Sequence, residues 1–265
     1  MAARFGNYHD YSGVSKPPAS ATHVVDPRLK ILNTLIPDLF TAKHCLDVGA
    51  NAGTVSVQLA AMCLILMPNL PAAFDFDAAS VTGIDIDPSL VGQARKLYAL
   101  RASRRRPPTA SSPPVVDYFP ISALLTHGYR VEPQAKPTHR PRVNFFAADW
   151  ALPTGQPVQP SYDVILALSV IKWIHLEHGD AGLLAFFAKC SASLRQGGYL
   201  AIELQEWDSY LKAVRPNHAP HFQQSLRELK YRPEDSFDQL LRDQGLHLCA
   251  SSHELPRRIL VYRKA

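Results

Sequence analysis

Apolar residues in this chain gather in seven short runs that alternate with segments of helical periodicity. The runs cover 44–50, 80–86, 142–149, 162–170, 198–205, 246–252 and 258–264. Apolar residues recur every three to four positions over 26–36, 55–66, 89–102, 180–194 and 233–244. Near-continuous apolar strands that alternate with helices are typical of a parallel sheet buried on both faces.

The last two runs are joined by a short link around Leu255 rather than by a helix. Parallel neighbours need a long crossover, so we expect these two strands to pair antiparallel, as a hairpin. The pattern therefore predicts an α/β fold. It has a seven-stranded, mostly parallel sheet with an antiparallel last strand, and helices on both faces.

Proline marks an interruption of this pattern. Of the 22 prolines, eight fall within 107–141, next to an arginine-rich stretch. Pro, Ser and Arg together cannot bury a face, so we predict a flexible basic insertion at about 101–141. Within it, 117–125 is apolar again and is expected to dock back onto the domain. We assign 26–265 to one domain and 1–25 to a separate N-terminal segment.

Composition narrows the class of protein. Apolar residues make up 46% of the chain, too many for a wholly disordered protein, and the formal net charge is +5. The most apolar run, 59–67, is about half as long as the roughly 20 residues that span a bilayer, so we expect no membrane contact. The widely spaced cysteines favour reduced thiols over disulfides or a zinc site; they are Cys45, Cys63, Cys190 and Cys249.

The same features bear on location. No apolar leader is seen at the N-terminus, and the thiol pattern favours an intracellular protein. The arginines at 101 and 104–106 could act as a nuclear signal, although we favour a solvated loop. We expect the nucleus rather than the cytoplasm.

The first run ends in a glycine-containing loop, 47–53, ahead of a helix. In an open α/β sheet this position is the crevice where nucleotide-like ligands bind. The NAD pattern G-x-G-x-x-G is absent. An acidic residue before the first glycine suits S-adenosyl-L-methionine (SAM), whose methionine end carries an amine and a carboxylate. The cofactor-binding candidates are Asp47, Gly49, Ala50, Asn51 and Gly53. An ordinary glycine turn is the alternative for this loop alone.

The next two strand ends carry acidic residues. Asp85, followed by Ile86, is placed to accept hydrogen bonds from both ribose hydroxyls. A helix N-cap is the other interpretation of Asp85, but Asp87 fills that role better. Asp149 can accept from the adenine amino group, and Trp150 can stack on the ring. Three such features in order on three strands predict a Rossmann-like class I SAM-dependent methyltransferase fold.

The fourth run and its extension resemble a known family, the bicoid-interacting-protein type RNA methyltransferases. The family pattern S-x-x-K-W-x-H-x-x-x-G-D is matched by Ser169, Lys172, Trp173, His175, Gly179 and Asp180. Other similar pieces occur in order along most of the chain, at 5–11, 28–32, 83–87, 119–125, 194–207 and 232–237. The resemblance implies SAM-dependent methylation of the 5′-terminal phosphate of a small structured non-coding RNA.

A phosphate oxygen is already anionic, so such a reaction needs positioning and cations more than a strong base. We expect Lys172 to clamp the phosphate. Trp173 would form one wall of the site or stack on the first base of the RNA. For His175, a hydrogen-bonded structural role and a substrate contact remain open. Leu168, just before this motif, is assigned to the cofactor site, and no metal is expected because paired ligands are lacking.

The resemblance also implies roles outside the motif. The N-terminal segment would fold over the cofactor and the RNA end, with Tyr8 at the substrate and Tyr11 at the catalytic centre. Arg28 matches a position expected to meet the SAM carboxylate. Glu203 and Trp207, at the end of the fifth strand, would shape the substrate cleft.

The chain departs from the family pattern at Ala50, at Ser12 and at Val14, where the family has Cys, Tyr and, nearby, Arg. These departures support a different class of function as the alternative. The protein would be an RNA-binding subunit of a ribonucleoprotein, with the methyltransferase fold as scaffold. Ribonucleoprotein proteins are possible partners in either case, and no DNA is expected. A small-molecule methyltransferase would leave the K-W-x-H motif unexplained.

Overall fold

The computed structural model describes residues 26–60, 76, 78–104, 106, 118–129, 142–152 and 158–265. The predicted N-terminal lid with Tyr8 and Tyr11, most of the predicted insertion, and Cys63 lie outside the described residues.

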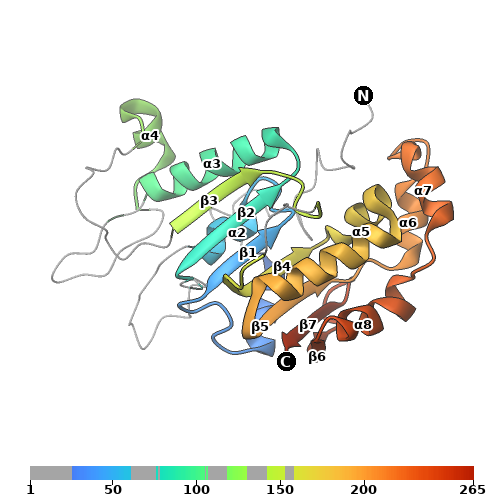
Figure 1. Ribbon diagram of the computed structural model, residues 1–265. Coiled ribbons are helices and arrows are strands. Elements are labelled where there is room, and N and C mark those ends of the chain that lie inside the picture. The colour runs from blue at the N-terminus through green and yellow to red at the C-terminus, as the bar shows by residue number, and fades with distance from the viewer. Residues whose placement is uncertain are drawn as a thin grey trace.

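A seven-stranded sheet forms the centre of the protein (Figure 1). Its strands are β1 (His44–Val48), β2 (Ser80–Asp85), β3 (Arg142–Ala147), β4 (Tyr162–Leu168), β5 (Leu194–Glu203), β6 (Leu246–Ser252) and β7 (Ile259–Lys264). Their order is β3-β2-β1-β4-β5-β7-β6, and β7 runs antiparallel to both β5 and β6. The predicted strands and the antiparallel last strand are confirmed. The order reverses between β1 and β4, so a crevice is expected at their carboxyl ends.

Helices cover both faces of the sheet, as predicted. They include α1 (Pro27–Leu35), α2 (Thr54–Leu59), α3 (Pro88–Ser103), α5 (Ile171–Ser193) and α8 (Pro233–Asp243). One core packs α5 and α8 against the sheet, as in the contacts of Leu46, Phe187 and Leu241. The other core packs α1 and α2 against the opposite face, around Leu32 and Cys45. Neighbouring residues of β1 thus enter different cores, because successive strand side chains alternate between faces.

Helix α5 begins earlier than predicted. Its second segment matches the prediction of 180–194, but a first segment begins at Ile171, directly after β4. The two are separated at Gly179, whose φ of 64° and ψ of −169° are not helical. The apolar sequence runs without a break from β4 into this segment, so periodicity alone could not separate strand from helix.

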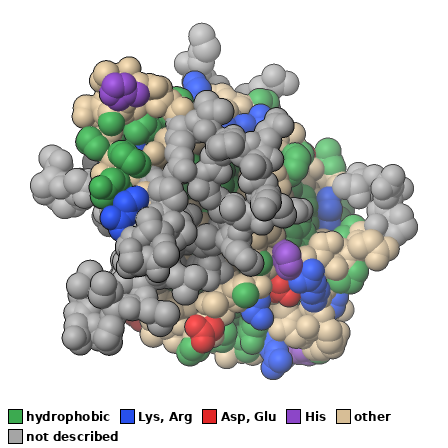
Figure 2. All heavy atoms as spheres, turned by 90° about the vertical axis from the view of Figure 1, so that its left-hand side faces the viewer, with side chains coloured by type: hydrophobic (Ala, Val, Ile, Leu, Met, Phe, Trp, Pro, Cys, Tyr) green, Lys and Arg blue, Asp and Glu red, His purple; other side chains and the backbone are tan. Residues whose placement is uncertain are grey.

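The insertion differs from its prediction at its start. Residues 101–103 are helical rather than flexible, because α3 continues to Ser103. A short helix, α4 (Ile121–His127), buries none of its residues, and Leu125 is 83% exposed. The segment contacts the end of α3 through the backbone amide of Phe119, which donates to the carbonyl of Arg104 at 3.0 Å. Figure 2 looks onto this side and shows hydrophobic side chains at the surface with Lys and Arg beside them.

Three further elements after β5 were not predicted: α6 (Trp207–Ala213), the 3-10 helix η1 (Pro220–Phe222) and α7 (Gln223–Glu228). They form their own apolar cluster, in which Tyr210 and Phe222 pack on Leu176 of α5. We call residues 207–229 the C-terminal cap. In Figure 1 the cap lies beside the first segment of α5, beyond the carboxyl ends of the strands.

Among the described residues, no helix combines the length and the apolar character needed to cross a membrane.

Candidate functional site

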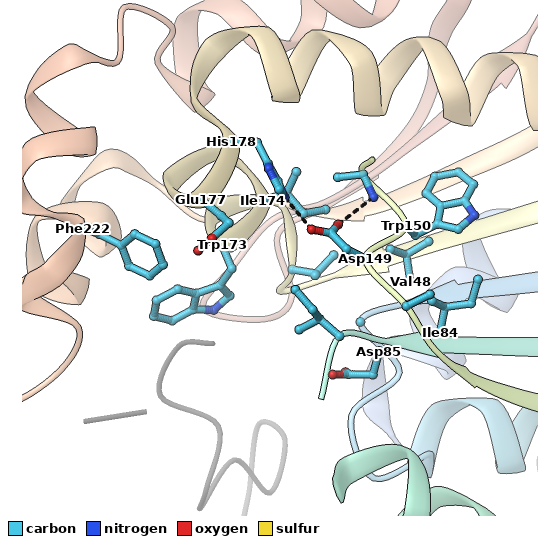
Figure 3. A pocket seen from close by; sticks show the side chains of 15 residues that line it. Val48, Ile84, Asp85, Asp149, Trp150, Trp173, Ile174, Glu177, His178 and Phe222 are labelled. Atoms are coloured by element: carbon cyan, nitrogen blue, oxygen red, sulfur yellow. Dashed lines mark hydrogen bonds and ion pairs between the residues drawn. The ribbon is translucent and has the colours of Figure 1, made fainter. Parts of the chain in front are cut away.

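A pocket of about 610 Å³, open mouth included, lies at the carboxyl ends of β1 to β4 (Figure 3). Six predicted residues line it: Gly49, Asp85, Ile86, Asp149, Trp150 and Trp173. The structure thus brings together one residue from the glycine loop, two strand-end carboxylates and the tryptophan of the family motif.

The glycine loop is shaped by close packing. Gly49 has a φ of +75°, and a Cβ on it would lie 2.6 Å from Cγ2 of Val170. Its amide donates to the carbonyl of Ile84 at 2.8 Å, which ties the loop to β2. Gly53 has a φ of +83° and a Cβ there would meet Ala94 of α3 at 2.7 Å. Both positions therefore require glycine for the backbone to pass between strand and helix.

Asn51 provides the observation that tests the fit of a cofactor. It has a positive φ of 52°, and its backbone amide donates to Oδ2 of Asp85 at 2.8 Å. Its Oδ1 accepts from the amide of Ala52, whereas its buried Nδ2 has no hydrogen-bond partner in the described structure. Buried polar groups in native proteins are nearly always paired. An unpaired donor in this loop fits a ligand with acceptor oxygens, such as the carboxylate of SAM.

Two residues of the loop, Asp47 and Ala50, face the protein interior. Both are buried and neither lines the pocket. Asp47 accepts a hydrogen bond from Oγ of Ser56 in α2 at 2.6 Å, and burial raises the pKa of its carboxyl to about 6. The carboxylate of Asp47 therefore anchors α2, and its contact with the cofactor stays a prediction.

Asp85 both braces the loop and faces the pocket. Its Oδ1 accepts from the amide of Asp87 at 3.0 Å, in addition to the bond from Asn51. Burial raises its pKa. The N-cap of α3 is Asp87, which accepts from the amide of Ser89 at 2.8 Å, as the sequence predicted. A carboxylate can accept about four hydrogen bonds, so Asp85 keeps capacity for ribose hydroxyls.

Asp149 and Trp150 lie at the other side of the pocket. Oδ1 of Asp149 accepts from the amide of Ala151 at 3.0 Å, and Oδ2 is 2.8 Å from Nε2 of His178. The Trp150 ring packs edge-on against Phe186, with its other contacts in the α5 core. These two residues can thus form one wall of an adenine site, with His178 orienting Asp149 (Figure 3).

Lys172 is buried rather than solvated, with 7% of its surface exposed. Its Nζ donates to Oγ of Ser209 at 2.8 Å and lies 4.6 Å from the centre of the Trp173 ring. Burial, with the charge of Arg257 as a smaller cause, lowers the pKa of Lys172 to about 8. Trp173 lines the pocket and packs against Phe222 of the cap at 6.2 Å. The ammonium group therefore lies beside the pocket wall without lining it.

His175 has a structural position. It is fully buried, with Nε2 2.9 Å from Oδ1 of Asp180 and Nδ1 3.3 Å from the hydroxyl of Tyr210. Burial lowers its pKa. Asp180 also accepts from the amide of Lys230, just beyond the cap. Of the two roles that the sequence left open, the geometry favours the structural one, which joins α5 to the C-terminal cap.

Arg28 and Glu203 form a buried ion pair outside the pocket. Nη1 of Arg28 lies 2.9 Å from Oε2 of Glu203, and Nη2 lies 2.6 Å from Oδ2 of Asp26. Glu203 is 1% exposed and also accepts from the hydroxyl of Ser169. Neither residue lines the pocket, and the roles of Arg28 at the cofactor and of Glu203 at the substrate stay predictions. Both side chains are held by the protein.

Two more predicted residues lie away from the pocket. Leu168 is buried in the core that α1 and α2 cover and does not line the pocket. Trp207 opens α6 and is stacked between Tyr210, at 5.1 Å, and the guanidinium of Arg232, at 3.4 Å. This stack joins the start of the cap to Arg232, the residue before α8.

Sequence reasoning missed nine pocket residues. Four of them adjoin predicted residues at the strand ends: Val48, Ile84, Ala148 and Ala151. The other five are Val170, Ile174, Glu177, His178 and Phe222. All of these five except Phe222 follow β4 at helical spacing, and a correct start for α5 would have placed them on one side of that helix. Phe222 had no sequence signal, because it reaches the pocket only through the fold of the cap. Within the described part of the chain, no group of three or more His, Cys, Asp or Glu side chains could hold a metal ion.

The chain is similar in sequence to known RNA methyltransferases. Residues 162–264 match the family model described as Bicoid-interacting protein 3 (Bin3). The chain is 30% identical over 277 residues to a probable RNA methyltransferase of Arabidopsis thaliana, covering 98% of this chain and 80% of that protein. It is 29% identical to the 7SK snRNA methylphosphate capping enzyme of Mus musculus, over 79% of this chain but only 32% of the longer mouse protein. It is 28% identical to the RNA 5′-monophosphate methyltransferase of Homo sapiens, over 99% of this chain and 81% of that protein.

Solved structures agree on the fold. The N-methyltransferase NodS of Bradyrhizobium japonicum has a TM-score of 0.51 and 12% identity, covering 90% of this chain and 94% of that one. An O-methyltransferase family protein of Burkholderia thailandensis has a TM-score of 0.52 and 14% identity, covering 90% and 55%. The predicted Rossmann-like class I methyltransferase fold is confirmed. Because 98% of this chain matches the plant relative at 30% identity and the family model matches from β4 to β7, the chain belongs to the Bin3 (bicoid-interacting protein 3) family.

Proposed function

We propose that the protein is a SAM-dependent RNA methyltransferase that methylates the 5′-terminal phosphate of a small structured non-coding RNA. The observation that carries the proposal is the placement of Lys172 and Trp173. The first turn of α5 sets an ammonium group and an indole beside a crevice whose loop fits SAM. The names of the mouse and human relatives, which specify an snRNA methylphosphate cap and an RNA 5′-monophosphate, support this choice of substrate.

Four residues would hold the cofactor. The Nδ2 donor of Asn51 suits the carboxylate, Gly49 lets the backbone approach, Asp85 can accept from the ribose, and Asp149 can accept from the adenine amino group. When bound, SAM supplies an electrophilic methyl group on a sulfonium centre.

The chain itself must supply positioning more than proton transfer. A terminal phosphate oxygen is anionic at neutral pH and is a sufficient nucleophile without a strong base. Lys172, oriented by Ser209 and by the face of Trp173, would hold the phosphate by charge. Trp173, with Phe222 behind it, offers an aromatic surface for the first base.

The test is methyl transfer from labelled SAM to one RNA prepared with a 5′-triphosphate, a 5′-monophosphate or a 5′-hydroxyl end. We expect label on the phosphorylated forms only, and loss of transfer in Lys172→Ala. Label that survives on the 5′-hydroxyl RNA would indicate base or ribose methylation and refute the proposal.

Cofactor binding is tested separately by calorimetry on two neighbouring aspartates. Asp85→Ala should abolish SAM binding, because Asp85 lines the pocket and braces the glycine loop. Asp87→Ala should leave it in place, because Asp87 caps α3 and does not line the pocket. Equal effects of the two variants would contradict the assignment.

One observation favours the second candidate function, an RNA-binding ribonucleoprotein subunit with little catalysis. Arg28, expected at the SAM carboxylate, is instead bound by Asp26 and Glu203. In that case Asp85→Ala would leave RNA binding and cellular function intact. We also propose ribonucleoprotein proteins as partners and a nuclear location; co-purification from nuclear extract and imaging of the tagged protein test these.

A further inference from the structure

The link between β6 and β7 delivers an arginine to the candidate site. Because β7 is antiparallel to β5, its first residue, Ile259, pairs with Glu203 at the carboxyl end of β5. The amide of Leu204 donates to the carbonyl of Arg258 at 2.8 Å, which fixes the link at this edge. Arg257 therefore lies at the same edge of the sheet as the strand ends that form the pocket.

The contacts of Arg257 point toward the family motif. Its Nη1 donates to Oγ of Ser169 at 2.9 Å. Ser169 directly follows β4 and has a positive φ of 61°, three residues before Lys172. Ser169 and Lys172 are joined by the short turn between β4 and α5, so the arginine and the lysine approach the same short segment. The lowering of the Lys172 pKa by the charge of Arg257 is consistent with this proximity.

Arg257 is not needed to neutralise Glu203. That carboxylate already has Arg28 at 2.9 Å, with both side chains almost fully buried. Arg257 is farther away, 3.9 Å from Oε1, and its side chain is 36% exposed. An arginine carries five N–H donors, and only Nη1 of Arg257 makes a contact that we find here. Its remaining donors are thus available to an anion.

Two cations at this point lack a close carboxylate partner. In the described structure Lys172 forms no ion pair and Arg257 only the 3.9 Å one with Glu203, whereas Asp26 and Glu203 both bind Arg28 closely. Two like charges held close together in a partly buried site are costly unless an anion joins them. A terminal phosphate, with a charge near −2 at pH 7, fits a pair of cations better than an internal phosphodiester with −1.

We propose that Arg257 is a second phosphate-binding residue, which forms with Lys172 a two-cation subsite that selects a terminal phosphate at the RNA 5′ end. This inference rests on the proposed function. It adds a residue from the β6–β7 link to the site and assigns it the discrimination between phosphorylated and unphosphorylated ends. Methylation of the phosphate removes one negative charge, so the subsite would bind the methylated product more weakly than the substrate.

The test measures binding of one fluorescent RNA, with a 5′-monophosphate or a 5′-hydroxyl end, to the full chain without cofactor. A hydrogen-bonded charged contact corresponds to about 10- to 100-fold in affinity. We expect Arg257→Gln to weaken binding of the phosphorylated RNA by that factor and to change binding of the hydroxyl form less than twofold. Arg257→Lys keeps the charge but loses the planar guanidinium that binds phosphate with two hydrogen bonds, so its loss of affinity should be intermediate.

Arg258→Gln is the matched control. It removes the same charge from the next residue, whose charge acts on Tyr262 in the core under α8. It should leave the preference for the phosphorylated end unchanged, and unfolding curves should show that all variants fold.

Three outcomes overturn the inference. Arg257→Gln could weaken the binding of both RNAs equally, which would mean that Arg257 attracts RNA only by general electrostatics. It could also leave the preference for the phosphorylated end intact. In either case methyl transfer to phosphorylated RNA by the wild-type protein would leave the proposed function standing. If the wild-type protein shows neither preference nor transfer, the subsite and the proposed function both fail.

Discussion

The substitution Lys172→Met tests whether Lys172 is retained for function or for stability. A lysine retained for function should leave the protein more stable when it is replaced, and a structural lysine should leave it less stable. The lysine is 7% exposed, and its ammonium group has a hydroxyl and a backbone carbonyl of Ser209 as partners instead of a carboxylate. Burial is the main reason that its pKa falls from 10.5 to about 8. That difference corresponds to roughly 3 kcal/mol of lost native-state stability while the lysine is charged.

Methionine has a similar length and no charge, so the substitution removes this cost. It also removes the hydrogen bond to Ser209, which is typically worth about 1 kcal/mol. We expect Lys172→Met to raise the free energy of unfolding by about 2 kcal/mol at pH 7. The same variant should lose methyl transfer to 5′-phosphorylated RNA. A residue that costs stability and is required for activity is one that the site retains for function.

The pH dependence of stability gives a second check on the direction of the stability change in Lys172→Met. Between pH 8 and 10.5 the unfolded lysine keeps its proton while the native one has lost it, so wild-type stability rises with pH there. The advantage of Lys172→Met should therefore shrink at pH 10. In the wild-type protein, binding of phosphorylated RNA should weaken above about pH 8, because the neutral amine no longer attracts phosphate.

The assay is urea unfolding of the wild-type protein and the variant at pH 7 and pH 10. Lys189→Met serves as the matched control. Lys189 also lies over a tryptophan, 4.8 Å from the Trp150 ring, but its Nζ donates to two backbone carbonyls and it is less buried. Its replacement should lower stability slightly. A loss of stability in Lys172→Met at pH 7, or undiminished methyl transfer, would refute the reasoning.

Three further predictions test the loop, the cap and the buried ion pair. Gly49→Ala should abolish SAM binding in calorimetry and lower stability, because its Cβ would lie 2.6 Å from Val170. The control is Gly92→Ala, whose Cβ would have no neighbouring atom within 4 Å; it should stabilise α3 by up to about 1 kcal/mol. Burial lowers the pKa of His175, so the unfolded chain binds its proton first, and urea stability should fall as the pH drops below 6.5; a profile that is unchanged in His175→Gln would contradict this. Glu203→Gln should cost about 3–5 kcal/mol, because it leaves a buried guanidinium without one of its carboxylates, and an unchanged urea midpoint would rule this out.

The amino-acid sequence determined the sheet and the cofactor loop. All seven strands followed from apolar runs, and the antiparallel end followed from the length of one link. Gly49 and Asp85 could be placed because their roles depend on backbone geometry within a few residues of a strand end. The family motif likewise located Lys172 and Trp173. Signals of this kind are local, so they can be read without knowledge of the packing.

Tertiary structure decided what the side chains do. The ion pair of Arg28 and Glu203 joins residues 175 positions apart and buries both side chains. His175 became structural because the C-terminal cap folds over it, and Phe222 reached the pocket by the same fold. Arg257 entered the site only because β7 returns antiparallel beside β5. Burial and charge neighbours come from distant parts of the chain, so the residue type alone could not fix these roles.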